Sequence, residues 1–423
     1  MKKEQISDAL NLLNDTFIEE TDCLRNRQKK VYKGVMFSKI FSVAGGYWKW
    51  AVVGVCMITV VFAGRQMLLR KPVGINQPVQ EEKLPMLSIT ENASDGMGFG
   101  GLWAYDISEI TNNNPWSGER QPSAMPVFKN QLSYDKDFIV SGADFGKMRE
   151  LLMEIAGRLG LDAASLEIKD DVPDEAEKQE IIEKMEGDVP DGYFNPTMLI
   201  AKADGMEITV DQTMQATVSF EPAIKLPDRY NFRNSASYEE TVSVAKYLLG
   251  QYKGFLCMED PQINIFHGDY SKHDAGYQQE YQISFYDAGK NSIEGIINYN
   301  FRQAEFDCDD SGRLFQASIC QADLSQKMGD YPIIQIEEAK KLLLKGNYIT
   351  TVPYKLPGEE FLAKTELVYR TGAREEYFMP YYCFYVELPE EERDGMKTYG
   401  TYYVPAVEGK YLSNMPLWDG SFN

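Results

Sequence analysis

The sequence predicts an α+β fold, in which a single N-terminal transmembrane helix precedes repeated units of one helix packed on an antiparallel sheet. Three observations lead to this prediction. An uncharged apolar stretch lies near the N-terminus, helical stripes of apolar residues recur beyond it, and segments that alternate apolar and polar residues follow each stripe. We expect domains at residues 1–46, 47–69, 70–124, 125–230 and 231–423, the last built of two helix-plus-sheet halves.

Composition narrows the range of functions. The 423 residues carry 43 basic and 64 acidic side chains, a net charge of −21, and only two histidines. An acidic chain without a basic patch argues against binding to nucleic acid. Scarce histidine lowers the expectation of a His-based metal site or a Ser-His-Asp hydrolase. Because no GxSxG, Walker or HExxH motif occurs, we expect no catalytic residue and no cofactor.

The charge is distributed unevenly along the chain. Residues 1–49 hold nine basic and six acidic residues, whereas residues 67–423 hold 33 basic and 58 acidic residues. Residues 50–64 are uncharged, and Trp48, Trp50 and Arg65 can anchor the flanks of this stretch at a membrane interface. We therefore predict a span over residues 47–69 in a cell membrane. A buried core helix and a cleaved signal peptide are the alternatives.

The positive-inside rule orients this span with the N-terminus in the cytoplasm and residues 70–423 outside. The cytoplasmic segment places Ile6, Leu10, Leu13 and Phe17 at steps of three and four residues, as on one face of a helix. This face can lie on the lipid bilayer, which the basic residues at 25–33 would favour. It can instead dock a cytoplasmic partner.

Beyond the span, residues 70–124 are rich in proline and glycine and indicate a linker. In the first unit, an apolar stripe from Phe145 to Leu159 predicts a helix that ends at Gly160. A charged surface helix is expected at 174–187. The alternation over 213–220 predicts a half-buried strand.

The second unit begins with a capping box, in which Ser237 and Glu240 start a helix that stops near Gly254. Alternation at 281–285, a turn at 287–292 and a returning strand at 297–301 then predict a hairpin. In the third unit, apolar residues at 336–343 predict a helix that ends before Gly346. Aromatic-rich strands follow through residue 403.

Two segments contain metal-ligand side chains. The motif at 266–274 holds His267, Asp269, His273 and Asp274, which are weak candidates for a metal site, because their spacing matches no known geometry and polar residues are common in loops. Residues 307–318 imitate the start of a calcium loop but carry serine in place of the glutamate at position twelve. A β-turn at 310–312 that joins two strands is the alternative.

The aromatic segment 377–403 permits two interpretations. Its tyrosines can pack in a core, or Tyr382, Tyr385 and Tyr402 can belong to a face that binds a partner. Cysteines expected outside the membrane lack CxxC spacing, so they can be buried thiols or can form disulfides. These cysteines are Cys257, Cys308, Cys320 and Cys383.

Several strings resemble a family of single-pass membrane proteins of clostridia-like Firmicutes. They include MPVFKNQLSYD (125–135), DLSQKMGDYPII (323–334), NYITTVPYKLPGEE (347–360) and MPYYCFYVELP (379–389). The string ISDALNLLNDTFIEE (6–20) resembles the cytoplasmic opening of proteins associated with extracytoplasmic-function sigma factors. The helix-plus-sheet units are similar in fold to PepSY-like domains and to the YycH and YycI regulators of a membrane sensor kinase. The resemblance implies a regulatory setting and assigns no role to any residue.

These observations favour a membrane-anchored extracytoplasmic protein with a sensory or regulatory role. We expect it to bind an unknown protein or envelope ligand and to be linked to a sigma factor or a sensor kinase. The alternative is a structural or binding module of the cell envelope, for which the N-terminus is a simple anchor. An envelope hydrolase is the third hypothesis.

Overall fold

The computed structural model describes residues 84–90, 99–119, 121–135, 138–162, 166–185, 189, 192–274 and 276–422. Outside them lie the predicted cytoplasmic segment and span, with the anchors Trp48, Trp50 and Arg65 and the helix face at Ile6, Leu10, Leu13 and Phe17. None of the helices in the described part is long and apolar enough to cross a membrane. The α+β prediction is confirmed there, because antiparallel sheets and five α-helices make up the described fold.

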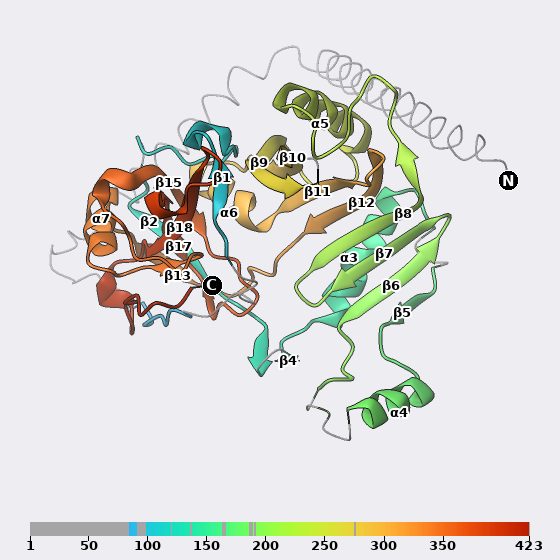
Figure 1. Ribbon diagram of the computed structural model, residues 1–423. Coiled ribbons are helices and arrows are strands. Elements are labelled where there is room, and N and C mark those ends of the chain that lie inside the picture. The colour runs from blue at the N-terminus through green and yellow to red at the C-terminus, as the bar shows by residue number, and fades with distance from the viewer. Residues whose placement is uncertain are drawn as a thin grey trace, which may run out of the picture. The chain divides into compact units, whose positions relative to one another are not determined.

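An eight-stranded antiparallel sheet runs in the order β5, β6, β7, β8, β12, β11, β10, β9 (Figure 1). Its strands are β5 (Ile168–Asp170), β6 (Met198–Ala203), β7 (Met206–Asp211), β8 (Gln215–Lys225), β9 (Pro261–His273), β10 (Gly276–Asp287), β11 (Gln303–Cys308) and β12 (Arg313–Cys320). β8 pairs with β12 over seven residues of the latter. Because this ladder joins strands from both sides of residue 230, the boundary expected there does not separate two sheets.

Two helices cover one face of this sheet. α3 (Phe145–Arg158) packs on β6, β7 and β8, and α5 (Tyr238–Tyr252) packs on β9 and β10. The expected stripe of α3 is confirmed, since Met148, Leu152 and Ile155 are completely buried. The expected capping box of α5 is also confirmed, because the side chains of Ser237 and Glu240 each accept a hydrogen bond from the other's backbone. We call this sheet with α3 and α5 the first lobe.

The remaining strands build the second lobe. One sheet has the order β1, β18, β17, β15 with β14 beside β18, and a three-stranded sheet has the order β13, β2, β16. The strands are β1 (Leu102–Ala104), β2 (Ala124–Lys129), β13 (Lys327–Pro332), β14 (Ile349–Thr350), β15 (Leu362–Tyr369), β16 (Tyr377–Phe378), β17 (Pro380–Glu387) and β18 (Lys397–Pro405). The helices α6 (Ser292–Phe301) and α7 (Ile336–Leu344) complete its core.

Smaller elements lie outside these layers. A hairpin of β3 (Ser133–Asp135) and β4 (Phe138–Ser141) precedes α3. The charged surface helix is confirmed as α4 (Glu175–Lys184), which has no buried residue. The 3-10 turns are η1 (Ile107–Glu109), η3 (Glu359–Phe361), η4 (Pro389–Glu391) and η5 (Gly409–Tyr411).

The returning strand predicted at 297–301 is wrong, because this segment is part of α6. The Asn291 side chain caps the helix by accepting a hydrogen bond from the backbone N–H of Glu294, at 3.0 Å. Ile296 and Phe301 are then buried in the second lobe, although α6 connects two neighbouring strands of the first. The alternation of Ile297 and Phe301 with polar residues concealed a helical period that also includes Ile293.

The linker prediction for 70–124 fails for the residues that the structure describes. Leu87 and Ala104 are fully buried, and Ile89 and Ile110 are nearly so. Leu87 forms a parallel β-bridge with Leu412 near the C-terminus. These short segments are therefore built into the core of the second lobe rather than leading to it.

Candidate ligand-binding site

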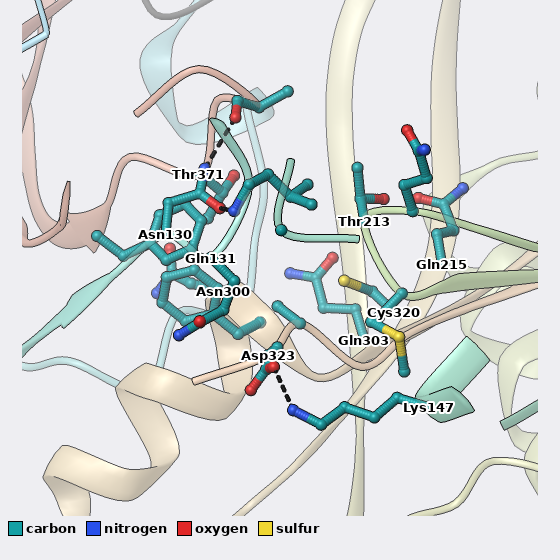
Figure 2. Close-up of a pocket in the computed structure, with 18 of the residues that line it drawn as sticks. Asn130, Gln131, Lys147, Thr213, Gln215, Asn300, Gln303, Cys320, Asp323 and Thr371 are labelled. Atoms are coloured by element: carbon teal, nitrogen blue, oxygen red, sulfur yellow. Dashed lines mark hydrogen bonds and ion pairs between the residues drawn. The ribbon is translucent and has the colours of Figure 1, made fainter. Parts of the chain in front are cut away.

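A cavity of about 350 Å³ lies between the two lobes. Figure 2 shows Asn130, Gln131, Asn300 and Thr371 on one side, Thr213 and Gln215 on the other, and Gln303 between them. Cavities of this size accommodate small organic ligands. Many of the side chains that line it are polar. What the cavity can bind therefore depends on which of these groups already have hydrogen-bond partners within the fold.

The floor of the cavity is the polar face of the eight-stranded sheet. Gln303 and Glu305 alternate along β11 with two buried residues, Ala304 and Phe306. These two belong to the hydrophobic core of the first lobe, beneath α5. Successive strand residues point to opposite faces. In register with Glu305, Ser318 of β12 adds a hydroxyl to the same face. The helices of the first lobe therefore cover only the apolar face, and the polar face is left for the cavity.

An ion pair closes one end of the cavity. Lys147 lies in the first turn of α3, and its Nζ is 2.6 Å from Oδ2 of Asp323 and 3.8 Å from Oδ2 of Asp144. The hydrogen bond to Asp323 raises the pKa of Lys147. Burial opposes ionisation of Asp323, but hydrogen bonds from Lys147 and Ser325 outweigh it and lower the pKa of this carboxyl. Both groups are therefore charged at neutral pH.

Several amides that line the cavity are already used by the fold. Asn130 donates to two backbone carbonyls, Gln212 donates to the carbonyl of Pro196, and Asn300 bonds the backbone of Ile296 and Tyr369. Gln131 differs from them, because its Nε2 is buried without a hydrogen-bond partner. A buried amide donor without a partner costs free energy. A ligand with an acceptor oxygen could remove this cost.

Glu305 is the second group without a partner. Among the described residues, no lysine or arginine forms an ion pair with the Glu305 carboxylate, and no side chain or backbone N–H donates a hydrogen bond to it. Burial raises the pKa of Glu305, the nearby Asp307 carboxylate raises it further, and His267 offsets part of the shift. A carboxyl in this setting can accept or donate a hydrogen bond and can bind a cation.

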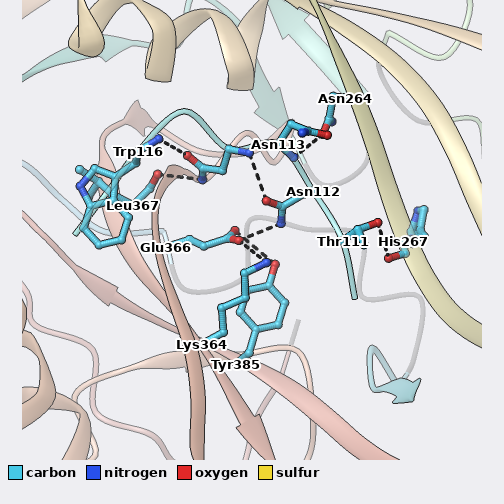
Figure 3. Close-up of polar contacts among 11 residues, drawn as sticks. Thr111, Asn112, Asn113, Trp116, Asn264, His267, Lys364, Glu366, Leu367 and Tyr385 are labelled. Carbon is cyan, nitrogen blue, oxygen red and sulfur yellow. Dashed lines mark hydrogen bonds and ion pairs between the residues drawn. The ribbon is translucent and has the colours of Figure 1, made fainter. Parts of the chain in front are cut away.

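An asparagine-rich segment bridges the two lobes beside β9 (Figure 3). Asn113 exchanges hydrogen bonds with β9: its N–H donates to Oδ1 of Asn264 at 2.7 Å, and its own Oδ1 accepts from the N–H of Ile265 at 3.0 Å. On the other side, Nδ2 of Asn112 donates to Glu366 of β15 at 2.8 Å. Residues 112–113 are therefore hydrogen-bonded to both lobes and connect them.

A loop of the second lobe forms part of the cavity wall and covers a buried ion pair. Nε of Arg370 is 3.1 Å from Oε1 of Glu375, and both side chains are almost fully buried. Oε1 of Glu375 is buried and nevertheless accepts no hydrogen bond. Burial therefore raises the pKa of Glu375 to about 7, and the attraction of Arg370 offsets only part of the shift.

The four metal candidates do not converge. His267 and His273 lie six residues apart on strand β9, which separates them by about 20 Å. His267 is 3.3 Å from Asp269, His273 is 2.8 Å from Glu280, and Asp274 follows the end of the strand. In the described part of the chain, no three His, Cys, Asp or Glu side chains gather around a possible metal position.

The turn alternative for residues 307–318 is confirmed. Gly312 donates its N–H to the carbonyl of Asp309 at 2.8 Å between β11 and β12. The Asp309 carboxylate accepts from the N–H groups of Ser311 and Arg313, both at 2.9 Å. This carboxylate therefore closes a turn, as short polar side chains commonly do.

The alternative that the aromatic segment forms a partner-binding face is wrong for Tyr382 and Tyr402. Both side chains are completely buried in the core of the second lobe. The hydroxyl of Tyr385 donates to Glu366 within the lobe at 3.4 Å. The core interpretation thus holds for the first two tyrosines. The four cysteines that the structure describes, Cys257, Cys308, Cys320 and Cys383, are free thiols, so the disulfide alternative is excluded for them.

Sequence reasoning did not identify Glu305, Gln131 or Ser318 as site residues. The alternation at 303–308 and 313–320 was a usable signal, because it predicts a strand pair with one polar face. It does not reveal that another lobe covers this face. In comparisons with known proteins, no family model and no curated protein matches this chain.

Proposed function

We propose that this chain is a membrane-anchored extracytoplasmic sensory or regulatory protein that acts by binding, with a small polar ligand in the cavity between its lobes. The observation that carries the proposal is a shared loop. Residues 370–376 line the cavity on one side and bind residues 84–90, which we call the strap, on the other. The strap follows the predicted span at 47–69 in sequence, so it lies on the covalent path from the cavity to the membrane.

On the cavity side, the loop contributes Thr371 and Ala373 to the lining. Nδ2 of Asn130, itself a lining residue, donates to the carbonyls of Ala373 and Glu375, both at 2.9 Å. Asn130 is buried, so water cannot readily replace these bonds. A ligand that displaces Asn130 would therefore shift the loop.

On the strap side, Nη1 of Arg370 donates to the carbonyl of Thr90 at 3.2 Å. The N–H of Glu376 donates to the Thr90 hydroxyl at 3.1 Å, and Ser88 donates to the Glu376 carboxylate. Three of the strap's polar contacts thus come from the two ends of the loop. If a ligand binds one conformation of the loop more tightly than another, it shifts the loop towards the favoured conformation. The stability of the contacts between loop and strap would then change by the difference between the two binding free energies.

The charge pattern supports the membrane arrangement in this proposal. A basic segment before residue 50 and an acidic body beyond residue 66 fit a cytoplasmic N-terminus and an extracytoplasmic body. In this arrangement, residues 1–46 contact the bilayer or a cytoplasmic regulator, for which a sigma factor or sensor kinase is the proposed class.

Amide hydrogen exchange of the full-length chain in detergent tests the link between cavity and strap. In the variant Asn130→Ala, the loop loses two hydrogen bonds, and we expect faster exchange at Leu87 and Ile89 of the strap. These amides donate to Tyr411 and Asn414 in the wild type. Exchange in α5, which is remote from the loop in sequence and belongs to the first lobe, should not change.

Gln215→Ala is the matched control, because it removes an amide from the opposite wall without touching the loop. It should leave the strap amides unchanged. Equal exchange of the strap in wild type and Asn130→Ala would contradict the proposal. That result would favour the alternative of an envelope binding module with a simple anchor, for which replacing residues 1–69 by an unrelated anchor should have no effect on cellular function.

A further inference from the structure

We propose that the cavity selects a ligand with a protonated amine, and that the carboxylate of Glu305 pairs with this ammonium group. The inference rests on the proposed function and names the ligand class of the same cavity. Hydroxyl or carbonyl oxygens elsewhere on the ligand would accept from Gln131, whose Nε2 is buried without a partner. The class is therefore a small polar amine, such as an amino sugar or a basic amino acid.

The balance of charge in the lining favours a cation. Four charged residues line the cavity, and three of them are acidic: Asp144, Glu305 and Asp323 against Lys147. Lys147 is committed to Asp323 at 2.6 Å and lies 3.8 Å from Asp144. Its charge is therefore shared between two carboxylates. No lysine or arginine among the described residues pairs with Glu305, and His267 offsets only part of its pKa shift. An ammonium group in the cavity would supply the direct counter-charge.

Two neighbours of Glu305 on the sheet are neutral hydrogen-bonding groups that also line the cavity. Gln303 precedes it by two residues on β11, and Ser318 is its register partner on β12. Neither can neutralise a carboxylate, but both can bond the hydroxyl or amide groups of a ligand whose amine pairs with Glu305. An anionic ligand would instead face an unpaired carboxylate at short range, which is unfavourable.

The rest of the protein favours the same class. Residues 67–423 hold 33 basic and 58 acidic side chains, so the body carries a large negative charge. Such a field raises the local concentration of cations and accelerates their association. It would slow the approach of an anion. The cavity and the body therefore select for the same sign of ligand charge.

Calorimetric titration of the full-length chain in detergent tests the proposal with two matched pairs of probes. D-glucosamine is compared with N-acetyl-D-glucosamine, and L-lysine is compared with its Nε-acetyl derivative, which distinguishes a sugar amine from an amino-acid amine. We expect one cationic probe to bind at millimolar concentration or below and its neutral counterpart to bind about ten- to a hundredfold more weakly.

The variant Glu305→Gln keeps the shape of the side chain and should weaken the cationic probe by about ten- to a hundredfold while leaving the neutral one unchanged. Asp307→Asn is the control, because it removes a carboxylate from the same strand and face but does not line the cavity. It should not weaken binding.

Three results would overturn the inference: equal affinity for cationic and neutral probes, no binding of either cationic probe at millimolar concentration, or equal losses in the two variants. The comparison of probes on the wild type does not depend on the folding of a variant. The exchange experiment on Asn130 needs no ligand, so a failure of the proposed function can be told apart from a failure of this inference.

Discussion

Replacing Asn264 by alanine should weaken the hydrogen-bonded contact between β9 and Asn113, which connects the two lobes. Asn264 is 3% exposed, and its Oδ1 accepts the N–H of Asn113 at 2.7 Å. Its Nδ2 donates to the Ser284 hydroxyl at 2.9 Å, and Ser284 is 1% exposed. The substitution Asn264→Ala therefore removes two hydrogen bonds in a region that water does not reach.

The magnitude follows from these contacts. Each lost hydrogen bond costs about 0.5–1.5 kcal/mol net, and a buried N–H left without a partner costs about 1–3 kcal/mol. Since Asn113 loses its partner but Ser284 can rotate its hydroxyl, we expect Asn264→Ala to lower the free energy of unfolding by about 2–4 kcal/mol. Urea denaturation of the full-length chain in detergent would measure this loss.

Two controls separate this contact from general effects at this strand. Ser284→Ala removes only the bond to Nδ2 and should cost about 1 kcal/mol. Gln262→Ala changes the same face of β9, where the amide bonds only the nearby Asp260 carbonyl, and should cost less than about 0.5 kcal/mol. If Asn264→Ala lowered the free energy of unfolding by less than about 1 kcal/mol, the claim that the hydrogen bonds between Asn113 and β9 hold the lobes together would be refuted.

Three further predictions concern the strap, the loop and the cavity wall. Because burial raises the pKa of Glu375 from 4.5 to about 7, the folded chain binds this proton more tightly than the unfolded chain. Stability should therefore fall by about 3 kcal/mol as pH rises through this range, and Glu375→Gln should abolish that slope in urea titrations at stepped pH. Leu87→Ala should lower the free energy of unfolding by about 2–5 kcal/mol, because Leu87 is completely buried. Gly142→Ala should lower the melting temperature in calorimetry and weaken binding in the cavity, because its φ is 97° and a Cβ would lie 1.8 Å from the carbonyl of Gln131.

Matched variants check the predictions for Glu375 and Gly142, and a threshold checks the prediction for Leu87. Glu338→Gln changes an exposed acid on α7 and should keep the wild-type pH slope. Gly157→Ala adds a Cβ to open space within α3 and should stabilise the chain by up to about 1 kcal/mol. A strap that contributes nothing to stability would leave Leu87→Ala within about 0.5 kcal/mol of the wild type.

Local signals predicted most helices correctly. The stripe of α3, the capping box of α5 and the charges of α4 are each contained in a short run of residues. The helix α6 escaped notice because Ile297 and Phe301 fit both a strand and a helical period. Its burial is decided by β15 of the second lobe, which is distant in sequence.

The cavity could be predicted only in part. Alternation around Glu305 and Ser318 indicates a polar sheet face, and such a face is ordinarily left to solvent. That the loop at 370–376 and Gln131 close over it depends on the packing of the second lobe. The metal candidates failed for a similar reason, because a strand holds His267 and His273 apart.

By itself, the sequence determined the α+β class, the caps and stripes of α3, α5 and α7, and the uncharged stretch and uneven charge from which the predicted span at 47–69 and its orientation follow. These features depend on neighbouring residues, because helix period, caps and net charge are local properties. The tertiary structure alone decided that β8 pairs with β12, that the strap is part of the core, and that Glu305 lines a cavity. Each of these contacts joins residues far apart in the chain, and its free energy comes from burial in the whole fold.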